Sequence, residues 1–182
     1  MPDYSDKSVS AEGIAAAASK AAKSGGLPPV HLWNPPFCGD LDMEIRADGT
    51  WFYNGTPIGR AAMVRLFSTI LKREGDDFFL VTPVEKVGIR VVDAPFVAID
   101  AEITPDRITF TTHVGDQVTA DADHPIIMRG NGGAPRPYVL VRAGLEALID
   151  RKTFYRLAAA ATEGPEGRVG IRSAGQFFPL EP

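Results

Sequence analysis

One nine-residue stretch occurs twice in this chain, and its repetition predicts the fold. It reads Ile58-Gly59-Arg60-Ala61-Ala62-Met63-Val64-Arg65-Leu66, and it returns as Ile149-Asp150-Arg151-Lys152-Thr153-Phe154-Tyr155-Arg156-Leu157. Both copies carry arginines at matching positions and place apolar residues on one face at helical spacing. Self-similarity at a fixed spacing indicates a duplicated structural unit. We therefore expect two related units, with a junction between them where a ligand binds.

The elements predicted around each copy follow a similar order of hairpin, helix and strand. Asp48-Gly49 is a tight-turn pair between two predicted strands, and Thr56-Pro57 is predicted to cap and begin the first helix. Asp150 is predicted to cap the second helix. Further strands are predicted from apolar alternation and turn residues at 78–82, 87–92, 96–103, 107–114, 117–122, 138–142, 168–172 and 176–180.

These patterns predict an α+β fold of two small, duplicated units, each a mainly antiparallel sheet with one main helix. We expect an N-terminal unit over residues 27–103 and a C-terminal unit over residues 104–182. A flexible, alanine-rich tail is expected over residues 1–26, with a short helix from Ser10 through Lys23. Because alanine offers little apolar area, we expect this tail to dock weakly.

Composition excludes several classes of protein. The chain has 182 residues and a net charge of −4, which argues against a nucleic-acid-binding protein because such proteins carry a basic surface. No apolar run is long enough to span a membrane, and the polar start lacks the features of a secretory signal. Cys38 is the only cysteine, so no disulfide forms within the chain. We expect a cytoplasmic protein with Cys38 as a small buried thiol.

Four blocks of sequence resemble a bacterial family of unknown function, domain-of-unknown-function family 1285. They are Phe37-Cys38-Gly39-Asp40; Asp48-Gly49-Thr50-Trp51 with Ile58 and Arg60; Thr82-Pro83-Val84-Glu85-Lys86; and Pro137-Tyr138-Val139 with Arg142, Gly144 and Leu145. The resemblance covers about residues 27 to 180, and its most specific block is Thr82 to Lys86. It implies a two-part α+β fold with repeated motifs and a role in signalling. It brings no catalytic residues.

The pair Glu85-Lys86 is the most suggestive candidate site, because Lys86 could hold a carboxylate or phosphate while Glu85 orients it. The alternative is a plain turn with solvated charges. Arg60 and Arg151 fall in the first turn of their predicted helices, where a cation opposes the helix dipole, so each needs an acidic partner or an anionic ligand. Trp51 could form part of an aromatic platform or belong to the core.

Other constellations support no site. Asp121, Asp123 and His124 resemble a metal cluster but make an ordinary polar turn equally well, and no metal or cofactor is predicted. Cys38 has no predicted base beside it. Catalytic residues therefore stay unassigned.

Three functions remain open. The first is a regulatory module in signal transduction that binds a small anionic ligand or a protein partner, with contacts from Glu85, Lys86, Arg60, Trp51, Arg142 and Arg151. The second is a small hydrolase or transferase that uses Glu85 with His124 or His31 for acid–base catalysis. The third is a purely structural or interaction subunit, in an oligomeric state that the sequence leaves open.

Overall fold

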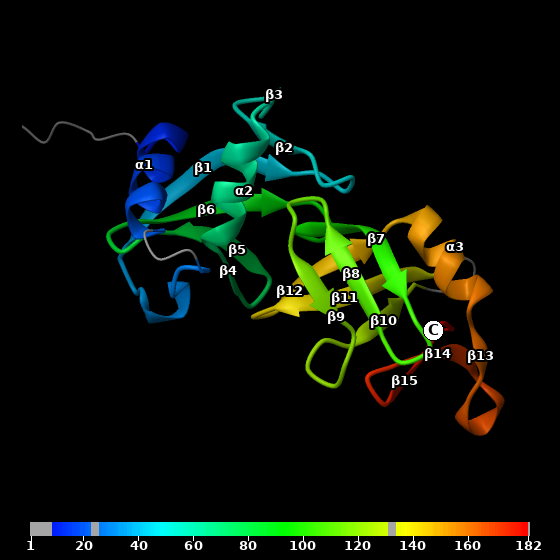
Figure 1. Cartoon of the computed structure of the whole chain (residues 1–182). Coiled ribbons are helices and arrows are strands. Elements are labelled where there is room, and N and C mark those ends of the chain that lie inside the picture. The colour runs from blue at the N-terminus through cyan, green and yellow to red at the C-terminus, as the bar shows by residue number, and fades with distance from the viewer. Residues whose placement is uncertain (1–8, 23–25, 131–133, 182) are drawn as a thin grey trace, which may run out of the picture. The chain divides into compact units, whose positions relative to one another are not determined.

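The computed structural model describes residues 9–22, 26–130 and 134–181. Contacts within the chain divide it into two compact units. The N-terminal unit runs to Val92 without Ala47–Gly49, and the C-terminal unit runs from Asp93 and includes Ala47–Gly49. Each unit contains a six-stranded sheet (Figure 1). The fold class is therefore α+β with two sheet-rich units, as the sequence predicted.

Sheet A of the N-terminal unit has the strand order β3-β2-β1-β6-β5-β4. Within the described residues, β1 and β6 form its only parallel pair, and its other neighbouring strands are antiparallel. The strands are β1 (Phe37–Ile45), β2 (Trp51–Tyr53), β3 (Thr56–Pro57), β4 (Leu71–Glu74), β5 (Asp77–Val81) and β6 (Lys86–Val91). A short 3-10 helix, η1 (Val30–Leu32), precedes β1.

Two α-helices belong to this unit: α1 (Ala11–Ala21) and α2 (Ala61–Thr69). Helix α2 covers the inner face of sheet A, where Phe67 stacks on Trp51 with ring centroids 6.1 Å apart. Helix α1 contacts α2, and its Ile14 and Ala18 have no exposed surface. The described part of the expected tail therefore includes a helix with buried residues. The rest of the expected tail, 1–8 and 23–25, lies outside the described residues.

Sheet B of the C-terminal unit has the strand order β10-β11-β12-β7-β8-β9, and its one parallel pair is β12 with β7. The strands are β7 (Phe96–Ile103), β8 (Ile108–Thr112), β9 (Gln117–Thr119), β10 (Ile126–Arg129), β11 (Arg136–Arg142) and β12 (Leu145–Ile149). Helix α3 (Arg151–Ala159) follows, and Asp150 caps it by accepting a hydrogen bond of 2.9 Å from the Thr153 N–H.

A small third sheet completes the C-terminal unit. It consists of β13 (Thr162–Glu163), β14 (Val169–Ser173) and β15 (Gln176–Pro179), with a short helix, η2 (Pro165–Gly167), between the first two. The buried Ser173 hydroxyl fastens it to sheet B. This hydroxyl accepts a hydrogen bond from the Ile108 N–H and donates one to the Ala120 carbonyl.

The two large sheets repeat one topology. In each, the first and sixth strands form the central parallel pair, and two three-stranded antiparallel sets extend from it. The first strands begin at Phe37 and Phe96, and the sixth strands begin at Lys86 and Leu145, which is a shift of 59 residues in both cases. The duplicated strand order therefore has a spacing of 59 residues, which differs from the spacing of the two nine-residue stretches. The matching nine-residue stretches instead include α2 and the start of α3. Helix α2 follows the third strand of sheet A, whereas α3 follows the sixth strand of sheet B.

Three predictions were wrong. Thr56-Pro57 does not begin a helix, because the Asn54-Gly55 turn returns the chain as β3 to pair with β2; helix α2 begins after Arg60. We expected the helical pattern to continue through Ile70 and Leu71 to a stop at Gly75, but α2 ends at Thr69 and the chain enters β4. The strand at residues 96–103, which we expected in the N-terminal unit, is β7 and pairs with β8 and β12 of sheet B.

Candidate functional site

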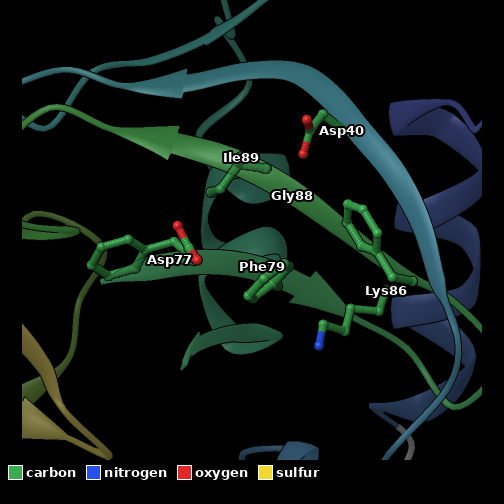
Figure 2. Close-up of a pocket in the computed structure, with 8 residues that line it drawn as sticks. Asp40, Asp77, Phe79, Lys86, Gly88 and Ile89 are labelled. Carbon is green, nitrogen blue, oxygen red and sulfur yellow. The ribbon is translucent and has the colours of Figure 1, made fainter. Parts of the chain in front are cut away.

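A pocket opens on the outer face of sheet A, on the side turned away from α2 (Figure 2). Ile45 and Trp51 pair on the inner face, so side chains of alternate residues such as Asp40 point to the other side. The pocket has a volume of about 320 Å³ and is lined by Phe37, Asp40, Asp77, Phe78, Phe79, Lys86, Gly88 and Ile89.

Parallel pairing of β1 with β6 creates this pocket. Its register places Phe37 opposite Lys86 and Asp40 opposite Gly88. The pairing therefore joins the block Phe37–Asp40 to the block Thr82–Lys86, although about fifty residues separate them in the chain. The ring of Phe79 on β5 meets that of Phe37 edge to face, with centroids 6.0 Å apart. Two distant sequence motifs thus share one site.

Gly88 forms the floor of the pocket. A Cβ atom at this position would overlap the Asp40 carboxylate and would lie 3.7 Å from the Phe37 ring. Its backbone conformation is an ordinary one for a strand, so left-handed geometry does not explain the glycine. What the missing side chain provides is room for Asp40 to lean over the strand.

Lys86 is already neutralised within the site. Its ammonium lies 2.5 Å from the Glu74 carboxylate and 4.4 Å from the centre of the Phe79 ring. Lys72 adds a second cation 3.5 Å from Glu74. The hydrogen bond from Lys86 lowers the pKa of Glu74, which stays ionised and holds the ammonium in place. An anionic ligand would have to compete with this carboxylate for Lys86.

The other charged groups of the pocket are carboxylates. Asp40 and Asp77 form no hydrogen bond or ion pair through their side chains within the part of the chain that the structure describes. By contrast, the neighbouring Asp42 is paired with Arg90 at 2.8 Å. The pocket lining carries two carboxylates against one ammonium group, so it presents negative charge beside two aromatic rings. Such a lining suits a cationic group.

Glu85 lies outside this pocket, in the turn before β6. Its backbone N–H donates a hydrogen bond of 3.0 Å to the Thr82 hydroxyl, and its carbonyl accepts one of 2.8 Å from the Thr82 N–H. Among the described residues of this unit, no hydrogen bond joins Glu85 to His31, one of the two histidines that we considered as its acid–base partner. Glu85 thus contributes a turn, through its backbone.

Two more predicted residues of the N-terminal unit lie elsewhere. Trp51 is 1% exposed and belongs to the core. Arg60 is the exposed N-cap residue of α2 and forms no ion pair with the described residues of its unit. Cys38, which we expected to be buried, is exposed, as are its neighbours Phe37 and Asp40 at the start of β1.

The two predicted residues of the C-terminal unit have different environments. Arg142 donates a hydrogen bond of 2.8 Å to Asp116 and lies over the Phe96 ring. Arg151, the first residue of α3, lines a second and separate cavity. Of the six predicted contact residues, Lys86 and Arg151 each line a pocket of their own unit.

A buried polar cluster lies near that second cavity. The Tyr138 hydroxyl donates a hydrogen bond of 2.7 Å to Asp93, and Arg136 lies 2.7 Å from the same carboxylate oxygen. Burial, together with Asp93, raises the pKa of Tyr138 to about 12, so the phenol stays protonated and acts as a donor. Arg136 and Tyr138 both engage this one oxygen of Asp93, whereas the other carboxylate oxygen, Oδ2, is buried and has no hydrogen-bond partner among the described residues.

His113 should make the stability of the C-terminal unit depend on pH. Burial lowers the pKa of this imidazole below its ordinary value of 6.5. Its Nδ1 accepts a hydrogen bond from the Val97 N–H, and protonation would remove that acceptor. The unfolded chain therefore binds a proton more readily than the folded one, so the free energy of unfolding should fall as pH drops below about 6.5.

Urea unfolding between about pH 7.5 and pH 5.5 checks this expectation, because most carboxylates titrate below that range. His113→Gln should remove the decrease, whereas the exposed His31→Gln should retain it. A decrease that persists unchanged in His113→Gln would contradict the assignment.

Comparison with known proteins identifies the family. The family model described as the N-terminal domain of a domain of unknown function (DUF1285) matches residues 28–94, and the model of the DUF1285 C-terminal domain matches residues 95–180. The chain belongs to the DUF1285 family. Within the described residues of this DUF1285 protein, no helix has the length and apolarity needed to cross a membrane. A search of curated proteins found no match.

Two solved structures of DUF1285 proteins resemble this chain. The protein from Silicibacter pomeroyi DSS-3 is 60% identical, with a TM-score of 0.84 over 92% of this chain and 94% of its own. The protein from Shewanella baltica OS155 is 30% identical, with a TM-score of 0.52 over 64% of this chain and 89% of its own.

Sequence reasoning missed Gly88, Asp77 and Phe79 as residues that line the pocket of sheet A. The sequence contained one signal for Gly88, because a glycine inside a predicted strand marks a close approach of another group. The partner of that approach, Asp40, could not be found from local pattern. It lies on a strand whose pairing with β6 is set only in the folded unit.

Proposed function

We propose that this protein is a partner-binding regulatory module whose N-terminal unit binds a basic side chain of another protein. One observation carries the proposal: the unpaired Asp40 carboxylate leans over Gly88 beside the Phe37 and Phe79 rings. An arginine side chain matches this arrangement because its guanidinium both pairs with carboxylates and stacks on aromatic rings.

The size of the pocket supports a side chain rather than a large ligand. Its volume of about 320 Å³ is near the lower end of the range for small-molecule sites, which is roughly 300–1,000 Å³. Two exposed apolar residues support a protein as the source. Phe37 is 56% exposed and Val84 is 67% exposed. They lie toward the same end of the parallel pair, because Phe37 is opposite Lys86. A partner surface would cover both.

We also propose that this module acts in signal transduction in the cytoplasm. A module that recognises a partner needs no catalytic group of its own, and the family resemblance implies the same kind of role. The anionic ligand expected at Lys86 is less well supported here, because Glu74 occupies that ammonium.

Replacing Asp40 tests the charge. Asp40→Asn keeps the shape of the side chain and removes its charge, so it should weaken binding of the peptide acetyl-Gly-Arg-Gly-amide. Asp40 is exposed, so the expected loss is modest, about two- to fivefold. NMR titration, which measures weak affinities, would follow the Gly88 amide signal.

Asp42→Asn is the matched control on the same strand. Its carboxylate is tied to Arg90 and does not line the pocket, so the affinity should change by less than about twofold. The corresponding citrulline peptide, which has the same shape without the charge, should bind more weakly than the arginine peptide. Equal affinities for the two peptides, or equal effects of both substitutions, would refute the proposal.

A further inference from the structure

The C-terminal unit contains a cavity that the function proposed above leaves unused. It has a volume of about 420 Å³ and lies between the start of β11, the end of β12 and helix α3. Most of its lining is apolar, from Pro135, Pro137, Leu148, Ile149, Phe154 and Tyr155. This volume is well within the range of small-molecule sites, so the cavity can enclose the apolar body of a ligand.

Two arginines also line this cavity, and they differ in their pairing. The Arg136 guanidinium lies 2.7 Å from Asp93, which compensates its charge. Arg151 is exposed and forms no ion pair with the residues that the structure describes in this unit. The cavity therefore combines apolar walls with a single uncompensated positive charge.

The position of Arg151 is well defined by its neighbours. The Asp150 N–H donates a hydrogen bond of 3.0 Å to the Ala98 carbonyl, and the Asp150 side chain caps the Thr153 N–H. The first bond anchors the start of α3 to strand β7, and the second closes the first turn of the helix. The guanidinium of Arg151 thus extends from an ordered backbone, so binding a ligand would have to order the side chain but not the segment that carries it.

We infer that this cavity binds a small amphipathic carboxylate, with its apolar body against Phe154 and Leu148 and its carboxylate on Arg151. A carboxylate is favoured over a phosphate because one free guanidinium matches a single negative charge and two acceptor oxygens. A phosphate dianion would require further donors, and Arg136 is already engaged by Asp93. This inference is independent of the peptide site in the N-terminal unit.

The experiment uses the full chain and a pair of matched compounds, 4-phenylbutyrate and the neutral 4-phenylbutanol, in calorimetric titrations. The wild type should bind the carboxylate more tightly than the alcohol. Arg151→Gln should weaken binding of the carboxylate about two- to fivefold and leave the alcohol unchanged. Lys152→Gln is the matched control, because it removes the same charge from the next residue, which does not line the cavity.

A second measurement locates the bound compound. NMR signals of Leu148 and Tyr155 should shift on titration, and Asp40→Asn should leave the affinity for the carboxylate unchanged. The inference is overturned if the wild type shows no saturable binding of 4-phenylbutyrate, or if it binds both compounds equally. It is also overturned if Arg151→Gln and Lys152→Gln have the same effect.

Discussion

Trp51→Ala is expected to destabilise the N-terminal unit by about 3–5 kcal/mol, the cost typical of removing a large aromatic side chain from a core. Trp51 is 1% exposed, pairs with Ile45 across the strands and stacks on Phe67 with an angle of 17° between the rings. Without the indole, Phe67 of α2 would lose the ring on which it stacks. Urea unfolding followed by circular dichroism would measure the change.

A second substitution separates the packing of Trp51 from its polar atom. The indole N–H is buried and has no hydrogen-bond partner among the described residues. Trp51→Phe keeps an aromatic ring against Phe67 and removes this unpaired donor, so it should cost less than half as much as Trp51→Ala. The half-buried Trp33 is the control, and Trp33→Ala should cost less than Trp51→Ala. A loss below about 1 kcal/mol for Trp51→Ala would contradict the assignment of Trp51 to the core.

Trp51 also illustrates what local sequence can and cannot determine. Alternation around Asp48-Gly49 correctly predicted the hairpin, and Asp150 correctly predicted the start of α3. Both depend on residues close together in the chain. Whether an aromatic side chain on a strand faces a helix or solvent depends on the other side of the sheet. Local pattern therefore found the strand of Trp51 and left its role open.

The repeat shows the same limit at a larger scale. Two helices of similar sequence suggested duplication, which the strand order supports, but the repeated strand order follows a different spacing. Amphipathic helices resemble each other because burial selects the same apolar positions. The order of six strands includes a parallel pair between the first and last strand, and nothing local specifies that pairing. The sequence therefore predicted a duplication but did not show which elements of the two units are equivalent.

The sequence likewise predicted some residues of the two pockets but not the residues that pair with them. Lys86 was identified from its motif, and Arg151 was identified from its position at the start of a helix, and each lines a pocket. Their partners were not predictable. Glu74 neutralises Lys86 from β4, a strand that the sequence pattern assigned to the end of a helix and its stop. Since the charge of a pocket is the sum over several strands, the sign of its ligand followed only from the fold.

Gly88→Ala is expected to reduce binding of the arginine peptide by more than about tenfold, the largest effect on binding that we predict, because it acts on two groups together. The added methyl group would fill the floor of the pocket and displace the Asp40 carboxylate. The fold should survive, because the obstructing atom is the end of a side chain that can rotate away. Gly88 also has a backbone conformation that alanine adopts.

The change in unfolding free energy for Gly88→Ala should be within about 1 kcal/mol, since alanine is less costly than glycine within a strand. Gly59→Ala is the control: this exposed glycine has no positive φ and no atom within 4 Å of an added Cβ, so both binding and stability should stay unchanged. Retained affinity in a folded Gly88→Ala variant would show that the peptide does not occupy this pocket.

A double-mutant cycle then connects Gly88 to Asp40. If the methyl group acts by displacing the carboxylate, removing the charge of Asp40 should matter little once alanine is present. The variant with both Asp40→Asn and Gly88→Ala should bind no more weakly than Gly88→Ala alone, so the two effects should not add. Full additivity would mean that the two residues act separately. The space above Gly88 would then affect binding by a route other than the position of the Asp40 carboxylate.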